Sequence, residues 1–192
     1  AITYTTIAPG NWQDPQTWQS GNVPDPESID GDQVIIQHNI NILNNNIKLI
    51  SGATMDVIDV TFNLLGGNLI IEDGTATFSN VVLYVESGWS IQQTTSDASL
   101  FIWGSSVDVG QNFQNSEGFR YLEDVCLIVD ENYQNDKGID SLINVCAIIG
   151  NSSSGSFQNN SNSLMYLSGS SFNILNGNFQ NQSSALMAGD II

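Results

Sequence analysis

The sequence predicts an all-β fold, a right-handed parallel β-helix (β-solenoid) with about 20–24 residues in each rung, where a rung is one complete turn of the coil. Two observations predict it. One short motif recurs at a nearly constant spacing, and apolar runs of strand-forming residues alternate with turns that contain Gly, Asn or Asp. The right-handed sense is the rule for parallel strands that are joined by a crossover.

The recurring motif is an aromatic residue followed by Gln and Asn. Its copies are Phe113–Asn115, Tyr133–Asn135, Phe157–Asn159 and Phe179–Asn181. The aromatic residues are 20, 24 and 22 positions apart, which suits one rung of short strands and turns. Neighbouring rungs lie about 4.8 Å apart, so we expect the aromatic rings to stack inside the coil and the amides to form ladders. A β-sandwich or mixed β fold is the alternative, but it gives no reason for this spacing.

The chain before the motif repeats a strand-like run, a turn with Gly and a second run. The pattern occurs in Ile47–Val57, Leu69–Phe78 and Leu83–Ile91. Val, Ile, Leu and Phe dominate the runs, and Gly supplies the positive φ that tight turns require. From residue 34 to the end of the chain we expect about seven rungs.

Cys126 and Cys146 are 20 residues apart, the same step as from Phe113 to Tyr133, so they are predicted to lie on neighbouring rungs, one above the other. Two interpretations stay open. The cysteines are small buried residues in one apolar stack, or they form a disulfide between rungs in an extracellular protein.

The N-terminal segment, residues 1–33, differs from the rest because it contains all four prolines of the chain together with Trp12 and Trp18. We expect this segment to be a cap that covers the first rung and blocks its exposed backbone edge. The coil then spans residues 34–192, as a fragment of a longer protein. A stacking platform for sugars is the alternative role for Trp12 and Trp18.

The same segment resembles the opening of secreted surface proteins of Bacteroidetes-type bacteria, in which a Trp-x-Asp-Pro-x-Thr-Trp…Gly-Asp-x-Val-x-Ile pattern precedes β-helical repeats. It is also similar to the start of the eight-glycine domain of eukaryotic surface proteins. The matching positions are Trp12, Asp14, Pro15, Trp18, Gly21, Pro24, Gly31, Asp32, Val34 and Ile36. The resemblance implies an extracellular, adhesive or scaffold-like module that is exported with a cleaved signal peptide. It supplies no catalytic residue.

Charged residues are scarce and mostly acidic: they make up 12% of the chain, and 3 basic against 20 acidic residues give a net charge of −17. Such a surface repels nucleic acid and anionic membranes. No apolar run approaches the roughly 18 residues of a membrane span. Neutral glycans, surface proteins and divalent cations are therefore the partners that the composition favours.

An acidic loop concentrates the carboxylates of Asp25, Glu27, Asp30 and Asp32 within eight residues. Calcium takes about six to eight oxygen ligands, so this loop is a candidate metal site and Ca²⁺ is the one cofactor that we consider. Asx turns in a capping loop explain the same residues equally well.

Trp89 and Trp103 lie near turns of consecutive rungs and are candidates for an aromatic strip that binds neutral sugars. Packing in the core or the turns is the alternative. Glycoside hydrolysis needs two carboxylates at a defined separation. Asp56 and Asp59 are three apart and point to opposite faces of a strand, whereas Asp108 and Asp130 are neighbours only if the register of the rungs brings them together.

These observations predict a secreted or cell-surface module that acts as an adhesin or a rigid scaffold without catalysis. A polysaccharide-active enzyme or its carbohydrate-binding domain is the first alternative. A subunit that associates end to end into filaments is the second.

Overall fold

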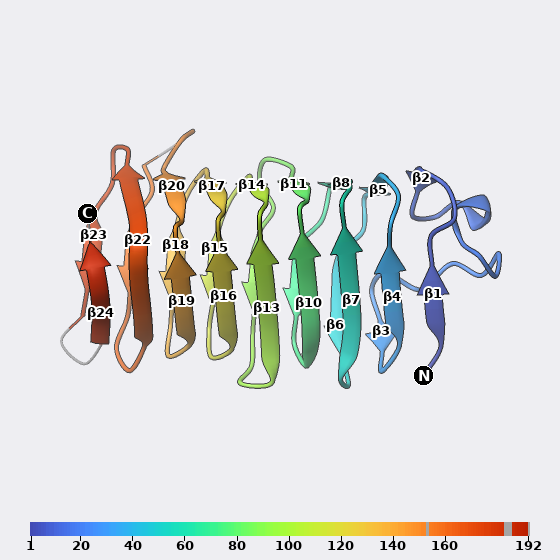
Figure 1. The fold of residues 1–192 in the computed structure, drawn as a ribbon, viewed down its shortest axis with the longest axis horizontal. Helices are drawn as coiled ribbons and strands as arrows, with labels where there is room; N and C mark the ends of the chain where they lie inside the picture. The colour runs from blue at the N-terminus through green and yellow to red at the C-terminus, as the bar shows by residue number, and fades with distance from the viewer. Residues whose placement is uncertain (153, 183–185, 192) are drawn as a thin grey trace.

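A computed structural model describes residues 1–152, 154–182 and 186–191. These residues form one coil of parallel strands whose axis runs from the N-terminal to the C-terminal end (Figure 1). In Figure 1 the front strands point upward, and the chain crosses over the top and descends at the back as it advances toward the C-terminus. The coil is therefore right-handed, as the sequence predicts.

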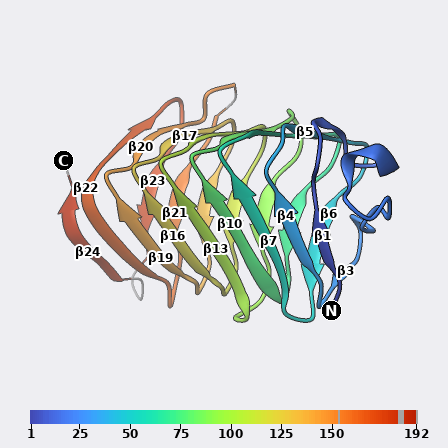
Figure 2. The ribbon, with the colours of Figure 1, turned by 45° about the vertical axis from the view of Figure 1, so that its right-hand side comes forward.

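The rungs contribute strands to three stacks, called here the first, second and third sheets (Figure 2). The first sheet contains β1 (Thr3–Thr5), β4 (Gln33–Ile36), β7 (Ala53–Ile58), β10 (Gly74–Ser79), β13 (Ala98–Trp103), β16 (Phe119–Glu123), β19 (Ile139–Ile143), the first part of β22 (Leu164–Ile174) and β24 (Leu186–Ile191). The second sheet contains β2 (Gly10–Asn11), β5 (Ile40–Leu43), β8 (Thr61–Leu65), β11 (Val82–Val85), β14 (Ser106–Val109), β17 (Cys126–Val129), β20 (Cys146–Ile149) and the last part of β22. The third sheet contains β3 (Ile29–Asp30), β6 (Ile47–Ile50), β9 (Leu69–Ile71), β12 (Ile91–Gln93), β15 (Phe113–Asn115), β18 (Tyr133–Asn135), β21 (Phe157–Asn159) and β23 (Phe179–Asn181).

From β4 to β23 the coil completes about seven rungs, which confirms the expected number. The step between paired residues of neighbouring rungs runs from 20, as in Cys126 to Cys146, to 25, as in Ile139 to Leu164. Side chains alternate between the inside and the outside of the coil, because successive residues of a strand point to opposite faces. β10 shows the pattern in full, with every second residue buried.

From the rung of β7 to that of β22, the corner between the first and second sheets has one residue in the left-handed conformation on each rung, with φ between 53° and 59°. These stacked corner residues are Asp59, Asn80, Gly104, Asp124, Asn144 and Gly169. Only Asn, Asp and Gly occupy the position, the residue types that adopt this conformation most readily. At Gly104 the fit is also tight, because a Cβ there would lie 2.5 Å from the side-chain oxygen of Asn80.

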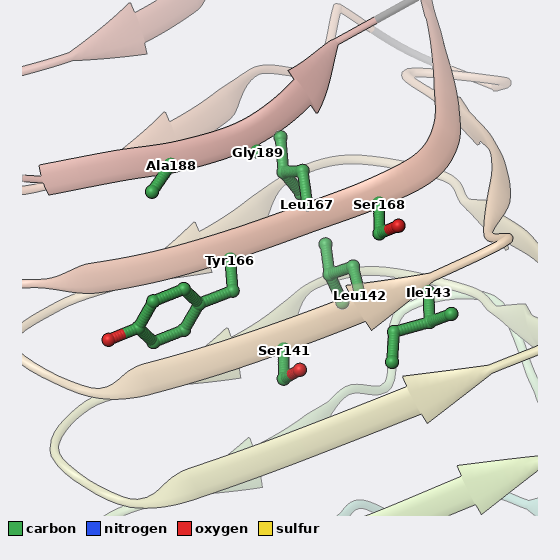
Figure 3. A pocket seen from close by; sticks show the side chains of 8 residues that line it. All are labelled: Ser141, Leu142, Ile143, Tyr166, Leu167, Ser168, Ala188 and Gly189. Carbon is green, nitrogen blue, oxygen red and sulfur yellow. The ribbon is translucent and has the colours of Figure 1, made fainter.

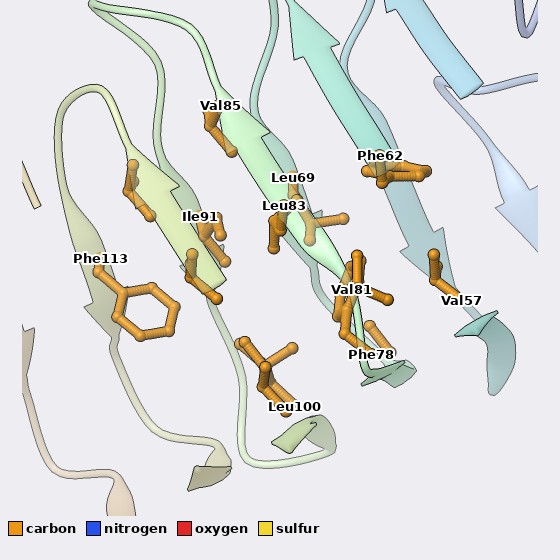
Figure 4. Packing of buried hydrophobic residues seen from close by; sticks show 14 of the residues in the cluster. Val57, Phe62, Leu69, Phe78, Val81, Leu83, Val85, Ile91, Leu100 and Phe113 are labelled. Atoms are coloured by element: carbon orange, nitrogen blue, oxygen red, sulfur yellow. The ribbon is translucent and has the colours of Figure 1, made fainter. Parts of the chain in front are cut away.

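The interior of the coil is a continuous apolar core (Figure 4). Phe62 and Phe78, on neighbouring rungs, are both fully buried and meet edge to face with ring centroids 5.8 Å apart. Leu83, Ile91 and Leu100 belong to the same buried cluster. Burial of such side chains contributes roughly 1.5–3 kcal/mol each relative to the exposed state, so the core is the main source of stability.

The N-terminal segment forms a rung of its own as well as a cap, because β1, β2 and β3 pair with β4, β5 and β6. Between β2 and β3 the chain leaves the coil in a loop that contains a 3-10 turn at Pro15–Thr17. Trp12 and Trp18 in this loop are buried, with centroids 4.9 Å apart. Trp12 Nε1 donates to the Pro24 carbonyl at 2.8 Å, and Trp18 Nε1 donates to the Trp12 carbonyl at 2.7 Å. Both indoles thus close the core at this end.

The predicted aromatic stack is present, with one interruption. Phe113, Tyr133, Phe157 and Phe179 pair in register on four rungs. The rings of Tyr133, Phe157 and Phe179 are parallel, with centroid separations of 4.9 Å and 5.1 Å. Phe113 and Tyr133 are instead nearly perpendicular and 5.7 Å apart.

The predicted amide ladder has an interruption at the same place. Asn135 donates to Asn159 at 3.1 Å, and Asn159 donates to Asn181 at 2.8 Å. Asn115, however, donates to Asp140 at 2.8 Å, so the side-chain oxygen of Asn135 is buried without a partner among the described atoms.

Both interruptions have one cause, the fully buried ion pair of Arg120 and Asp140, which occupy in-register inward positions of β16 and β19. The Arg120 guanidinium lies 4.3 Å from the Phe113 ring centre and 4.4 Å from that of Tyr133, between the two rings. Asp140 also accepts a 2.7 Å hydrogen bond from the Tyr133 hydroxyl. One ladder amide and one stacked ring are therefore diverted to satisfy a buried charge.

Candidate functional site

Apolar and aromatic side chains gather on the outer surface of the first sheet, in its C-terminal half. The aromatic face, as we call it, consists of Phe101, Trp103, Phe119, Tyr121 and Tyr166, which project outward from β13, β16 and β22. Ile139, Ile143 and Leu164 extend it between the rings. Because outward residues of successive rungs are in register, these side chains form columns parallel to the axis of the coil.

The rings of the aromatic face lie close enough to form one surface. The Phe101 centroid is 5.7 Å from that of Phe119 and 6.5 Å from that of Tyr121. Trp103 is 37% exposed and Tyr166 is 48% exposed. The Tyr121 hydroxyl donates to Glu123 at 2.8 Å, and this hydrogen bond raises the pKa of Tyr121, which therefore stays a neutral donor at physiological pH.

A shallow hollow of about 180 Å³ adjoins Tyr166 (Figure 3). It exists because the neighbours of Tyr166 in its own column are small: Ser141 on the preceding rung and Ala188 on the following one. Ile143 and Ser168 line the side toward the second sheet. The ring of Tyr166 thus lies beside two short side chains, and the hydroxyl groups of Ser141, Tyr166 and Ser168 line the same hollow.

The N-terminal half of the same surface has no aromatic ring and is mostly polar, although Ile58 is exposed there. Thr54, Thr75 and Ser99 form one column there, and Asp56 and Thr77 belong to the next. The aromatic face therefore begins at β13 and is a local feature rather than a property of the whole sheet.

In the part of the chain that the structure describes, no Lys or Arg side chain is left without a carboxylate partner. The three basic side chains are each paired with a carboxylate: Lys48 with Glu72, Arg120 with Asp140 and Lys137 with Glu117. Together with the net charge of −17, this arrangement disfavours polyanionic ligands.

Of the tryptophans predicted to bind sugar, the structure places Trp103 on the aromatic face. Trp12 and Trp18 are 0% and 1% exposed and close the core, which fits the expected cap, whereas the alternative role as a sugar platform does not fit this burial. Trp89 is partly buried against the core between β11 and β12, on the opposite side of the second sheet from the corner where Trp103 ends β13. It does not form a strip with Trp103.

The acidic loop does not gather its carboxylates. Among the described residues no group of three or more His, Cys, Asp or Glu side chains is placed to hold a metal ion, so the candidate calcium ligands Asp25, Glu27, Asp30 and Asp32 do not form such a cluster. Asp25 accepts the backbone N–H of Glu27, and Glu27 accepts that of Asn46. Asp32 accepts the N–H of Ile2. The loop carboxylates thus stabilise backbone turns and the chain start, as the alternative interpretation expects.

Asp108 and Asp130 do influence one another across successive rungs of the second sheet. Partial burial raises the pKa of Asp108, and the nearby charge of Asp130 raises it further. Asp108 lies between Tyr84 and Ile128 in its column, on a different sheet from the aromatic face.

The cysteines are in register on β17 and β20, as predicted, but both side chains are exposed. The interpretation as buried residues is wrong, because Val125 and Val145 take the inward positions beside them. Both cysteines are free thiols in this structure.

The sequence reasoning identified one member of the aromatic face, Trp103, and missed Phe101, Phe119, Tyr121 and Tyr166. The signal for Phe101 and Tyr121 was present, since they are 20 residues apart, the same step as Phe113 to Tyr133. Their outward direction depends on the phase of each strand, which the structure supplies.

No helix among the described residues is long and apolar enough to cross a membrane. Comparisons with known proteins leave the family open: no protein-family model, no curated protein and no solved structure matches the chain.

Proposed function

We propose that this protein is a secreted or cell-surface module that binds neutral glycans without catalysis, as an adhesin whose stiff coil presents the aromatic face. The observation that supports it most is the gathering of five aromatic rings on one outer surface of the coil. Exposed apolar patches of this kind mark interaction sites.

The chemistry of the face favours a neutral sugar polymer. Aromatic rings pack against the apolar C–H faces of sugars, and the hydroxyls of Tyr121, Ser141, Tyr166 and Ser168 offer hydrogen bonds to those of the ligand. No Lys or Arg projects from the described part of this surface to hold a carboxylate or sulfate. The columns run along the axis and carry rings on β13, β16 and β22, so a linear polymer meets several weak contacts at once, and their affinities combine.

The test is a pull-down of the purified chain against insoluble neutral and acidic polysaccharides, with an assay of the supernatant for new reducing ends. We expect retention on at least one neutral polymer, weaker retention on acidic ones and no new ends. Retention on none of the neutral polymers overturns the proposal. New reducing ends overturn its non-catalytic part and direct attention to Asp108 and Asp130.

Matched variants locate the site. Tyr166→Ala removes an exposed ring from the aromatic face and is expected to weaken binding roughly tenfold, about 1.4 kcal/mol. Tyr84→Ala removes a ring of comparable exposure, 37%, from the second sheet and should leave binding unchanged. Equal losses in the two variants would contradict the assignment of the site.

A further inference from the structure

Cys126 and Cys146 stand one above the other on the outside of the second sheet, at the first positions of β17 and β20. Their surroundings are nearly identical. Each follows a corner residue in the left-handed conformation, Asp124 or Asn144, with φ of 53° in both cases. The Asn144 amide donates to the Asp124 carboxylate at 3.0 Å, which ties the two corners together. The two side chains therefore leave the backbone in the same direction.

We propose that Cys126 and Cys146 are a site of disulfide formation that joins two consecutive rungs covalently. Neighbouring strands lie about 4.8 Å apart, within the roughly 4.4–6.8 Å between Cα atoms that a disulfide requires. The column continues with Ser106 below and Ser171 above, whose short side chains leave the sulfur atoms free to rotate toward one another.

The site is accessible to an oxidant. Both thiols are exposed, so an oxidised low-molecular-weight thiol such as glutathione disulfide reaches them without unfolding the coil. The thiolate of one cysteine attacks a sulfur of the glutathione disulfide, which releases one reduced glutathione and leaves a mixed disulfide. The second cysteine thiolate then attacks the protein sulfur of that mixed disulfide and releases the second glutathione. The two cysteine protons end on the two released thiols.

The bond would reinforce the rungs that also hold the buried ion pair. Arg120 and Asp140 connect β16 to β19, and the disulfide would connect β17 to β20, with the same step of 20 residues. These two rungs contain the polar interruption of the core, so a covalent link on their outer surface fixes the register where polar side chains replace the apolar stack.

The test is incubation of the folded chain with glutathione disulfide, followed by intact mass measurement and peptide mapping without reduction. We expect a monomer that has lost the mass of two hydrogen atoms and a linked peptide pair containing Cys126 and Cys146. The Cys146→Ser and Cys126→Ser variants should instead each retain one glutathione, which shows that each thiol reacts by itself. A wild-type chain that keeps two free thiols or two glutathione adducts, or that forms disulfide-linked dimers, would overturn the proposal.

Discussion

Substitutions in the buried ion pair of Arg120 and Asp140 are expected to have a large effect on stability. Asp140 accepts hydrogen bonds from Nε and Nη2 of Arg120, from the Tyr133 hydroxyl and from the Asn115 amide, and no part of the Arg120 or Asp140 side chain reaches solvent. Asp140→Leu removes the only carboxylate of the cluster. The guanidinium is then buried without a counter-charge, and the tyrosine hydroxyl has lost its acceptor.

The magnitude follows from these contacts. Loss of one partner of a buried ion pair costs about 3–5 kcal/mol, and a buried hydroxyl without a partner adds about 1–3 kcal/mol. We expect Asp140→Leu to lower the free energy of unfolding by about 4–8 kcal/mol, a large share of the roughly 5–15 kcal/mol of a typical domain. Arg120→Met should lower the free energy of unfolding by about 3 kcal/mol, because Asp140 keeps two hydrogen-bond donors, the Tyr133 hydroxyl and the Asn115 amide. The double variant should cost only about 1–3 kcal/mol, since both charges are gone.

Urea unfolding of the wild type, both single variants and the double variant measures these values. Tryptophan fluorescence and circular dichroism should be compared in each case, because rungs of a repeat protein can unfold in parts. A double variant whose loss equals the sum of the two single losses would refute the reasoning, since it would show that the two side chains do not depend on one another.

Three further predictions concern single side chains. Burial raises the pKa of Tyr133 well above its ordinary value, so the stability that the neutral phenol contributes is present below the unfolded pKa of about 10 and is lost as the pH rises above it. Between pH 10 and 12, the free energy of unfolding measured in urea should therefore fall less steeply with pH in Tyr133→Phe than in the wild type, and equal slopes would argue against the buried phenol. Burial and the charge of Asp130 raise the pKa of Asp108, so the protonated carboxyl favours the folded state at acidic pH and the ionised carboxylate disfavours it. Asp108→Asn should therefore raise the melting temperature at pH 7 but not at pH 3. An equal shift at both pH values would exclude the carboxylate as the cause. Trp12→Ala should lower the free energy of unfolding by about 3–5 kcal/mol in the same urea assay, and a loss below about 1 kcal/mol would mean that the indole does not close the core.

The architecture was predictable because a solenoid repeats its own signal. The aromatic residues Phe113, Tyr133 and Phe157 set the step of the coil, and the same step correctly placed Cys146 over Cys126. Stacking at every rung makes each copy of a motif independent support for the others.

The polar interior was not predictable in the same way. Arg120 and Asp140 each occur in a strand that reads as ordinary alternation, and the sequence does not reveal that both occupy inward positions. Their pairing depends on the exact phase of β16 and β19, and a shift of one residue would point both to solvent. The cysteines show the same limit, because their spacing was predicted correctly and their outward direction was not.

The site was predicted only in outline. Trp103 was identified by residue type, whereas for Trp12 and Trp18 the sequence left sugar stacking open beside the expected cap, and the structure places both at the end of the core. Residue type alone does not distinguish a tryptophan that packs in a cap from one that lies on a binding surface. The difference arises from the loop between β2 and β3, which folds back over the coil.

The most direct test of glycan binding by the aromatic face is an NMR titration of the labelled protein with oligosaccharide fragments of a retained polymer, followed at the indole N–H signals. Trp103 lies on the face, whereas Trp12 and Trp18 are buried at the N-terminal end. We expect the Trp103 signal to shift with ligand concentration while the signals of Trp12 and Trp18 stay in place. Binding that leaves Trp103 unchanged would contradict the account and place the ligand on another surface of the coil.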